Sequence, residues 1–375
     1  AASDVYKRQM NNEYKYDITI PDFYSTEEFE NAYTYDGGDL GATWSKESTT
    51  FKVWAPTAAG VKVNLYKGGE EGEDDLIESH DMKSDDKGVW EVKVDGDLNG
   101  TYYTYTADFG DTQNEACDPY AKTVGVNGDR AMVIDMDSTN PAGWDNDSNP
   151  NKNLKNTDVS IYELHVRDLS SDASSGIKNT GKYLGLTETG TTNSKGQSTG
   201  LDHIKELGIT HIQLNPVYDY ATVDETKLDT NQFNWGYDPK NYNSPEGSYS
   251  TDPYNGDVRV KEFKEMVKTL HDNDISVVMD VVYNHTYSTD YCYNKLVPDY
   301  FYRPGSNGSG CGNDVASERA MVRNFIVDSV AYWAKEYHID GFRFDLVGLI
   351  DVQTIKEIRA ALDLSLIHIS EPTRH

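Results

Sequence analysis

The stretch Gly341-Phe342-Arg343-Phe344-Asp345-Leu346 decides how the rest of the chain is interpreted. Its apolar and charged residues alternate, which predicts a short buried strand with the phenylalanines on one face and Arg343 and Asp345 on the other. A guanidinium beside a carboxylate keeps the carboxylate ionised and ready to act as a nucleophile. Taken alone, a purely structural Arg–Asp pair explains the stretch equally well.

Three similar runs precede this stretch, and apolar residues at helical spacing follow each of the four. Residues 159–166, 211–217 and 276–282 are predicted strands, so strand and helix alternate four times. This predicts a parallel sheet that forms the first half of a (β/α)₈ TIM barrel. The helical stripes contain Leu201, Ile204 and Leu207; Phe263, Met266, Val267 and Leu270; Val322, Ile326, Val330, Trp333 and Tyr337; and Val352, Ile355, Ile358 and Leu362, while Lys264, Glu265 and Lys268 are expected to face water.

Long loops rich in Gly, Asn and Ser leave the C-terminal ends of the first three predicted strands. They cover residues 170–200, 219–255 and 284–313, and loops of this length are uncommon unless they are functional. In a (β/α)₈ barrel the C-terminal face carries the active site. The candidate site is therefore expected at this face.

The first third of the chain is β-rich. Short alternating runs separated by turn signals predict an all-β, immunoglobulin-like sandwich over residues 36–141. A segment at 10–35 precedes it, and a polar linker at 142–157 separates it from the half-barrel at 158–363, so a multidomain protein is expected. The predicted sandwich strands include residues 50–54, 61–66, 89–94 and 100–105.

Both ends of the chain fit neither neighbouring pattern. Residues 1–9 and 364–375 resemble peptides translated from adapter sequence, so they are interpreted as a non-native leader and a non-native tail. On this interpretation we expect the natural protein to continue past Asp363. A cytoplasmic location follows if Met10 is the true start, because the residues after it are polar and lack the apolar core of a signal peptide.

Composition excludes several classes of partner. A net charge of −29 argues against nucleic acids and anionic membranes, which require basic surfaces. Cys117, Cys292 and Cys311 are odd in number and widely spaced, so they form neither a disulfide framework nor a metal-ligand pattern. The longest apolar run, residues 275–283, is interrupted by Asp280 and is too short to span a bilayer. Oligomeric state is left open.

Three groups of polar and aromatic residues converge on the rim of the predicted barrel. Residues 280–285 place an Asp inside the third strand and a His just past its end, and residues 341–345 place an Arg and an Asp at the fourth. Residues 234–239 add two aromatics and an amide on the loop after the second strand. Each group alone has an ordinary explanation, such as a surface His or a loop with its own small core. Their combination at one rim, in this order, favours a functional site.

These residues also carry a resemblance to a known family. Residues 280–286 (DVVYNHT) and 341–346 (GFRFDL) resemble two signature regions of the α-amylase superfamily of glycoside hydrolases. NWGYDP at 234–239, followed by NSPEGSYS at 243–250, resembles the segment that marks type I pullulanases. Phe233 stands where that family usually has Tyr, which conserves packing but removes a hydroxyl. The resemblance extends over residues 23–362 and implies that the chain corresponds to the N-terminal part of such an enzyme.

The resemblance implies roles for individual residues at the sugar-binding site. Asp345 is expected to be the nucleophile that forms a covalent glycosyl-enzyme, and Arg343 to orient it. His285 is expected to hydrogen-bond the hydroxyls of the bound sugar, and Tyr237 to stack under its ring. Asn284 is expected either to join this network or to help hold a Ca²⁺ ion, although no cofactor is required. Asn234, Trp235 and Asp238 are the other implied substrate contacts, and Asp280 is implied to organise the site from behind.

The implied reaction is the retaining hydrolysis of α-1,6 branch linkages in pullulan, amylopectin or limit dextrins. Retention requires two carboxyl groups about 5 Å apart, one as nucleophile and one as acid and then base. The family's acid Glu follows a fifth strand, and its second Asp follows a seventh, so no residue of this sequence can be assigned to either role. We therefore expect the chain alone to be poorly soluble and to hydrolyse no pullulan.

Other functions remain open at this point. FKVWAPTA at 51–58 and the strands after it resemble the starch-binding modules that precede debranching enzymes, so a non-catalytic α-glucan-binding protein is one alternative. Trp54 and Trp90 could be sugar platforms there, although core positions are favoured roughly two to one. Among enzymes, isoamylase-type debranching and α-1,4 hydrolysis are the nearest rivals. A scaffolding protein is disfavoured because it leaves the convergent rim unexplained.

Overall fold

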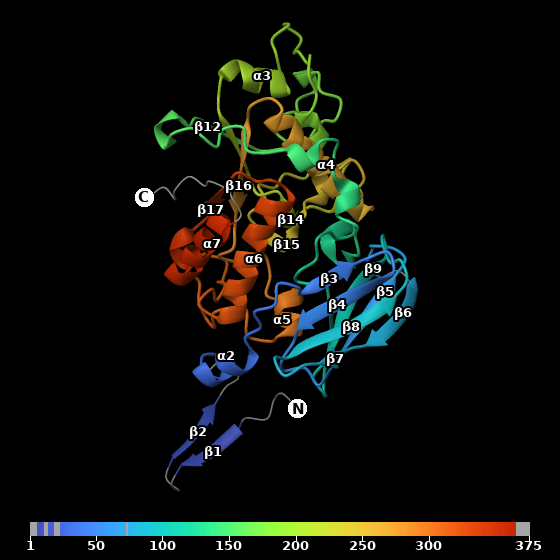
Figure 1. Cartoon of the computed structure of the whole chain (residues 1–375), viewed down its shortest axis with the longest axis vertical. Coiled ribbons are helices and arrows are strands. Elements are labelled where there is room, and N and C mark those ends of the chain that lie inside the picture. Colours follow the sequence, from blue (N-terminus) through green and yellow to red (C-terminus); the bar gives the residue numbers. More distant parts are fainter. Residues whose placement is uncertain (1–5, 11–13, 19–22, 73, 365–375) are drawn as a thin grey trace.

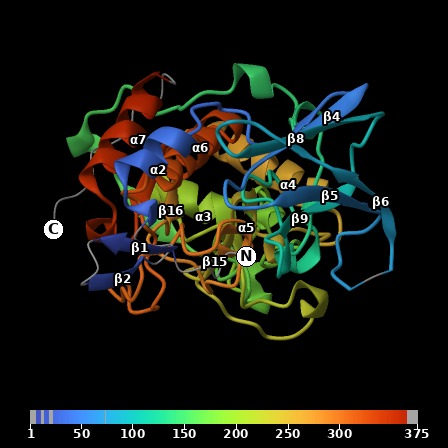
Figure 2. The ribbon, with the colours of Figure 1, turned by 90° about the horizontal axis from the view of Figure 1, so that it is seen from below.

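The computed structural model describes residues 6–10, 14–18, 23–72 and 74–364. A β-sandwich and a layer of parallel strands with helices lie side by side, with α5 (Cys292–Leu296) between them (Figure 1). Seen from below, the sandwich strands lie on one side and helices α6 and α7 on the other (Figure 2). The predicted fold class is confirmed, and no closed barrel forms within the described ranges.

The sandwich consists of one five-stranded and one four-stranded antiparallel sheet. The first has the order β10-β9-β5-β6, with β11 also on β9, and the second has the order β3-β4-β8-β7. In β4, Phe51 and Val53 turn inward and are 0% and 3% exposed, as the alternation predicted. The strands are β3 (Gly41–Trp44), β4 (Ser48–Trp54), β5 (Gly60–Tyr66), β6 (Leu76–Asp81), β7 (Lys83–Ser84), β8 (Val89–Asp95), β9 (Tyr102–Asp108), β10 (Gln113–Ala116) and β11 (Ala131–Met132).

The predicted βα units form one parallel sheet with the order β12-β13-β16-β17. The strand β16 is buried along its whole length, as is usual for parallel strands, and it is apolar except for Ser276 and Asp280. Antiparallel strands β14 and β15 form a separate pair in the loop after β13. The elements are β12 (Ile161–Leu164), α3 (Gly200–Leu207), β13 (His211–Leu214), β14 (Tyr218–Tyr220), β15 (Pro239–Pro245), α4 (Gly256–His271), β16 (Ser276–Val281), α6 (Ala320–Glu336), β17 (Gly341–Phe344) and α7 (Val352–Leu364).

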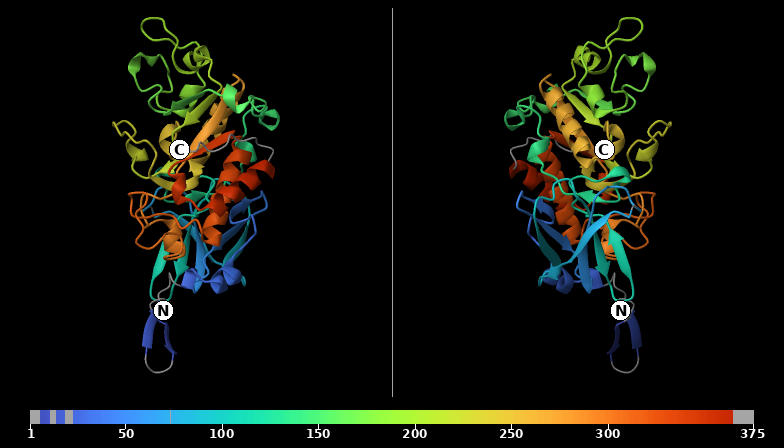
Figure 3. Two further views of the ribbon diagram at one scale, coloured as in Figure 1. Left: turned by 90° about the vertical axis from the view of Figure 1, so that its left-hand side faces the viewer. Right: turned by 90° about the vertical axis from the view of Figure 1, so that its right-hand side faces the viewer.

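The remaining elements are short. Hairpin β1 (Tyr6–Met10) and β2 (Tyr14–Ile18) projects from one end of the molecule (Figure 3), so part of the predicted leader, residues 6–9, lies in a strand. Residues 1–5 and 365–375 lie outside the described residues. No helix among those described is long and apolar enough to cross a bilayer. Helix α2 is Glu27–Tyr33, and the 3₁₀ turns are Val126–Gly128, Asp137–Thr139, Trp144–Asn146, Asn156–Asp158, Ala173–Ser175, Tyr183–Leu186, Glu225–Lys227, Gly247–Tyr249 and Val347–Leu349.

The strand that carries Arg343 differs from the prediction. It ends at Phe344 rather than Leu346, and it is not buried, because among the described residues β17 is an edge strand that pairs with β16 alone. The side chain of Arg343 is 43% exposed, and that of Asp345, just past the strand, is 17% exposed. The alternation itself is kept, so the two charged side chains share one face.

Helix α4 carries a buried lysine where a water-facing one was expected. Lys264 is 0% exposed, and its Nζ donates to Glu336 Oε1 on α6 and to Asn140 Oδ1 just before the linker. The expectation that Lys264 faces water is therefore wrong. The segment leading into the linker crosses this face of α4 and takes the place of solvent.

A buried histidine fixes the linker to the sheet. His271, the last residue of α4, contacts Asp147 Oδ2 through Nδ1 at 2.8 Å and Asp340 Oδ2 through Nε2 at 2.9 Å. Asp340 immediately precedes β17 and also accepts from the Val277 amide. Although burial opposes the charge, the two carboxylates raise the pKa of His271 to about 9. His271 is therefore cationic at neutral pH.

This network predicts a loss of stability in alkali. The pKa of His271 rises from 6.5 to about 9 on folding, so its stabilisation is complete below pH 6.5 and is lost as the pH rises through about 9. Linkage gives about 3 kcal/mol for such a shift. Urea unfolding of wild type between pH 6 and pH 10 should show this loss, and His271→Gln should flatten the profile. An equal slope in both proteins would contradict the assignment, and His203→Gln serves as the control.

Tryptophans of the sandwich serve the core. Trp54 is 9% exposed, donates through Nε1 to the Tyr33 carbonyl, and packs edge-on against Tyr300 of the half-barrel at a centroid distance of 4.8 Å. Trp90 is half-buried and donates to the Ala55 carbonyl. The core interpretation is therefore correct for Trp54, which cannot offer its face to a sugar.

Candidate functional site

Two adjacent strands bring a buried carboxylate and a guanidinium together. Asp280 on β16 and Arg343 on β17 are paired in register. Arg343 Nη1 donates to both oxygens of Asp280, at 3.0 and 2.9 Å, and to Asp345 Oδ1 at 2.9 Å. One guanidinium thus links a carboxylate that is 0% exposed to one at the rim. This arrangement orients Asp345 through the sheet itself.

Asp345 is held from its other side by the loop after β16. Asn284 Nδ2 donates to the main-chain carbonyl of Asp345 at 2.9 Å and lies 3.5 Å from its Oδ2. The next residue, Leu346, has a φ of 46°, so the chain turns sharply after Asp345. Oδ1 of Asp345 is bound by Arg343 at 2.9 Å, whereas Oδ2 has only the longer contact with Asn284. Oδ2 is therefore the less tightly bound oxygen.

The loop between β14 and β15 completes the hydrogen-bond network at Asp280. Tyr237 donates its hydroxyl to Asp280 Oδ2 at 2.7 Å. His285 is 5% exposed, its Nε2 lies 3.0 Å from the Tyr237 carbonyl oxygen, and its Nδ1 lies 2.6 Å from Asn284 Oδ1, so both ring nitrogens face oxygen acceptors. Six of the residues singled out in the sequence are thereby connected: Tyr237, Asp280, Asn284, His285, Arg343 and Asp345.

Burial controls the ionisation of this network. It raises the pKa of Asp280 to about 6, against the opposing effects of Tyr237 and Arg343. Burial also lowers the pKa of His285, although the Tyr237 carbonyl opposes this. At neutral pH the site therefore combines ionised Asp280 with neutral His285.

The other implied contacts lie in the same loop on either side of Tyr237. Asn234 and Asp238 bind each other, with Nδ2 to Oδ2 at 3.1 Å, and Asp238 also accepts from the Thr222 amide. Both side chains therefore shape the loop. Trp235 is different, because it is 60% exposed and stands next to Phe233, which is 56% exposed. It is the one of the three that presents a free surface.

The residues around Asn284 do not suit a Ca²⁺ ion. Both atoms of its amide are already engaged, by Asp345 and His285. Asp314, which pairs with His285 in a β-bridge, accepts from Ser306, Gly308 and Ser309. Of the two roles considered for Asn284, the structure therefore supports membership of the hydrogen-bond network.

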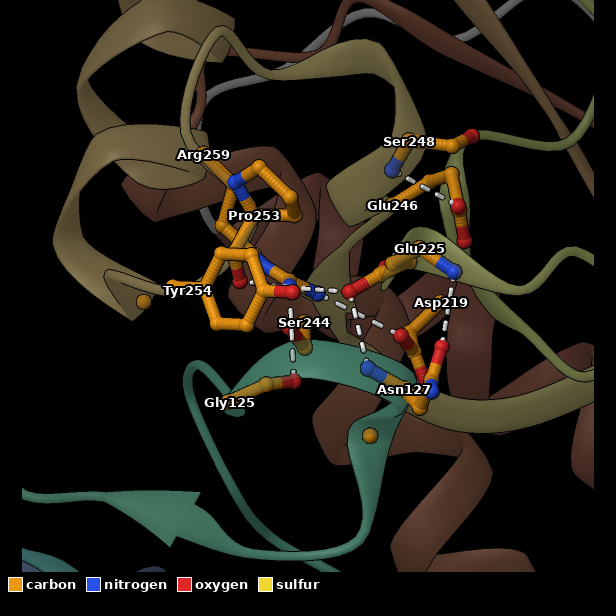
Figure 4. Close-up of polar contacts among 12 residues, drawn as sticks. Gly125, Asn127, Asp219, Glu225, Ser244, Glu246, Ser248, Pro253, Tyr254 and Arg259 are labelled. Atoms are coloured by element: carbon orange, nitrogen blue, oxygen red, sulfur yellow. Dashed lines mark hydrogen bonds and ion pairs between the residues drawn. The ribbon is translucent and has the colours of Figure 1, made fainter. Parts of the chain in front are cut away.

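A second acidic cluster lies behind the rim and is also unsuited to a metal. Asp219, Glu225 and Glu246 have carboxylate oxygens within 4.8 Å of one another, and all three are buried. The guanidinium of Arg259 already occupies the place of a cation, with bonds to Glu225 at 2.9 Å and Asp219 at 3.3 Å (Figure 4). A Cβ on Gly247 would lie 2.2 Å from Arg259 Nη2. The space is therefore filled by protein.

Arg259 also joins the sandwich to the half-barrel. Its Nη2 donates to the Gly125 carbonyl at 3.3 Å, and Glu225 exchanges two bonds with Asn127. Gly125 and Asn127 belong to the loop between the sandwich strands β10 and β11. Burial and the neighbouring Glu225 raise the pKa of Asp219 to about 7. The same two causes raise the pKa of Glu246 well above its ordinary range. Arg259 is thus the cation that contacts two of these three crowded carboxyls, Asp219 and Glu225.

Sequence reasoning did not single out Arg259 or His165. His165 follows β12, has a side chain that is 8% exposed, and contacts the Asn234 carbonyl at 2.7 Å. A polar residue near the C-terminal end of the predicted strand at residues 159–166 was a usable signal for His165. Arg259 carried no such signal, because a basic residue in the first turns of a helix is ordinary.

Comparison with known proteins shows the class to which this fold and site belong. Residues 39–121 match carbohydrate-binding module 48 (isoamylase N-terminal domain), and residues 105–304 match the α-amylase catalytic domain. The chain therefore belongs to the α-amylase family of glycoside hydrolases, with an N-terminal carbohydrate-binding module of family 48.

Within that family the chain is similar to pullulanases. It is 43% identical over 349 residues to the pullulanase of Bacillus subtilis, covering 91% of this chain and 47% of the relative. A crystal structure of the Paenibacillus barengoltzii pullulanase in complex with maltohexaose and α-cyclodextrin superposes with a TM-score of 0.88 at 50% identity, covering 91% of this chain and 54% of that one. Maize isoamylase SU1 is 31% identical over 83% of this chain and 42% of its own length. The chain spans about half the length of these proteins.

Proposed function

We propose that this protein contributes to the retaining hydrolysis of α-1,6-glucosidic linkages in branched α-glucans such as pullulan. The observation that carries the proposal is the Arg343–Asp345 pair at the rim, connected through Asp280 to Tyr237, in a chain similar to pullulanases. The binding of maltohexaose by a structural neighbour supports an α-glucan as the ligand.

In the proposed reaction Asp345 attacks the anomeric carbon and forms a covalent glycosyl-enzyme. Arg343 binds Oδ1, so the less engaged Oδ2 is the attacking oxygen. Tyr237 is hydrogen-bonded to Asp280, and its ring is proposed to stack on the sugar. Neutral His285 contacts the main-chain carbonyl of Tyr237 and so holds this residue in place. A second carboxyl must protonate the leaving oxygen. Asp280 cannot do so, because it is fully buried and both its oxygens are bound.

The experiment compares two proteins on pullulan. One is the 375-residue chain, and the other is residues 1–363 joined to the remaining part of the Bacillus subtilis pullulanase. We expect reducing-sugar release from the joined protein and none above a buffer blank from the chain alone, since an acid catalyst contributes about 10²- to 10⁴-fold. Release by the chain alone would contradict the second expectation. Activity of the joined protein on glycogen rather than pullulan would favour isoamylase-type debranching.

Glycan binding without hydrolysis is the second candidate. The match of residues 39–121 to a carbohydrate-binding module favours it. Affinity electrophoresis of the whole chain in pullulan or starch gels tests it, and retardation without hydrolysis would support it. Because Trp54 is buried, we expect Trp54→Phe to leave any retardation unchanged.

A further inference from the structure

The loop that presents Trp235 is held at both ends by histidines from two different strands. His165, just after β12, contacts the main-chain carbonyl of Asn234 at 2.7 Å. His285, after β16, contacts the main-chain carbonyl of Tyr237 at 3.0 Å. The main chain of the segment Asn234–Tyr237 is thereby bound at both ends by an imidazole, and Trp235 and Gly236 lie between the two contacts.

The contacts of His165 define its protonation. Its Nδ1 accepts from the Asp168 amide at 3.3 Å, so the ring proton lies on Nε2 and points at the Asn234 carbonyl. Tyr249 places its hydroxyl 3.1 Å from the same nitrogen and packs edge-on against the ring. The imidazole side chain is 8% exposed, so this bond is shielded from water.

The other side of the loop leaves little freedom. Gly236 has a φ of 87°, and a Cβ there would lie 2.6 Å from the Pro216 carbonyl. The ring of Phe233 lies 5.7 Å from that of His165 and stands perpendicular to Trp235 at 6.1 Å. One imidazole therefore touches the backbone that carries Trp235 and one of the two exposed rings.

We propose that His165 is a positioning residue, whose Nε2–H bond to the Asn234 carbonyl fixes the aromatic edge formed by Phe233 and Trp235 for stacking against an α-glucan chain. The inference rests on the proposed function for its ligand but not for its geometry. Two exposed aromatic side chains on a mobile loop would lose conformational freedom on binding sugar, and this loss would weaken the binding. A loop that is hydrogen-bonded at both ends holds these side chains in one orientation before the sugar binds.

A matched pair of substitutions separates this role from simple packing. His165→Gln places an amide N–H near the position of Nε2, whereas His165→Asn reaches only the position of Nδ1. The Gln variant can therefore keep the bond to Asn234, and the Asn variant can keep the bond from Asp168. Both are neutral amides of similar polarity, so a general effect of replacing the ring would appear in both.

Acrylamide quenching of tryptophan fluorescence in the 375-residue chain is the measurement. Trp235 is 60% exposed, while Trp44, Trp54, Trp90, Trp144 and Trp333 are buried or half-buried, so Trp235 dominates quenching and Trp235→Phe provides the background. Maltotriose is the probe ligand. We expect it to protect Trp235 in wild type and His165→Gln, and to bind about tenfold more weakly in His165→Asn, as one lost hydrogen bond implies.

The outcomes are distinct. Greater quenching in His165→Asn than in His165→Gln, without sugar, supports positioning whether or not maltotriose binds. Equal quenching in the two variants overturns it. If wild type shows no protection by maltotriose while the two variants still differ, the proposed function fails and the positioning role stands.

Discussion

Replacing Asp345 with Asn should lower pullulan hydrolysis by about 10⁴-fold or more, the scale on which removal of a covalent nucleophile acts in other hydrolases. The protein to use is the one joined to the remainder of the Bacillus subtilis pullulanase. An amide cannot form the glycosyl ester, yet its Oδ1 can still accept from Arg343, and the main-chain bond from Asn284 is unaffected. Initial rates of reducing-sugar release measure the effect, with exposed Asp95→Asn as the control.

Chemical rescue distinguishes a nucleophile from an organising carboxylate. In Asp345→Ala, azide should react with α-maltosyl fluoride in the space of the missing carboxylate, displacing fluoride and giving β-maltosyl azide. Fluoride leaves without protonation, so this reaction does not need the acid catalyst. If Asp345 only orients other groups, azide will not restore turnover, and no β-azide will form.

Arg259→Met should reduce the free energy of unfolding by about 3–5 kcal/mol, the usual effect of removing one partner from a buried ionic network. Arg259 is 0% exposed and is the cation among Asp219, Glu225 and Glu246. Without it, at least two of these carboxyls must remain protonated at neutral pH. Urea unfolding at pH 7 measures the effect, and Lys261→Met, which breaks an exposed ion pair on the same helix, is the matched control.

The loss should depend on pH in a defined direction. Protonation relieves the repulsion that Arg259 normally neutralises, so the difference between wild type and Arg259→Met should shrink toward pH 5 and grow toward pH 8. The pKa of Asp219 is already raised to about 7 by burial, which places the change inside this window. A difference that stays constant from pH 5 to pH 8 would mean that lost packing, and not charge, explains the destabilisation.

Regular elements were predictable because their physics is local. Alternation in Ser48–Trp54 and the stripe from Val322 to Tyr337 each follow the period of one strand or one helix, and their inward residues are buried as expected. The rim was predictable for a related reason. Parallel strands end at one face, so Asp280 and Arg343 had to meet once their strands were neighbours.

Long-range polar contacts could not be predicted in the same way. Lys264 lies on the polar side of its helix by periodicity, and nothing in that pattern reveals that Asn140, 124 residues earlier, covers it. The bond between His165 and Asn234 spans 69 residues and ends on a main-chain carbonyl, which has no sequence signature. The exposure of β17 depended on how many neighbours the strand has, which its own residues do not encode.

The joint at Arg259 bears on how such proteins evolve. Gly125 and Asn127, which the sandwich contributes to the joint, lie beyond the matched binding module at 39–121 and inside the stretch matched to the catalytic domain at 105–304. The two family matches overlap at residues 105–121, so the sequence has no clear boundary between the two domains. A recombination event that moved the sandwich into another enzyme would leave Glu225 and Arg259 without their partners. The sandwich and the half-barrel are therefore expected to be inherited together.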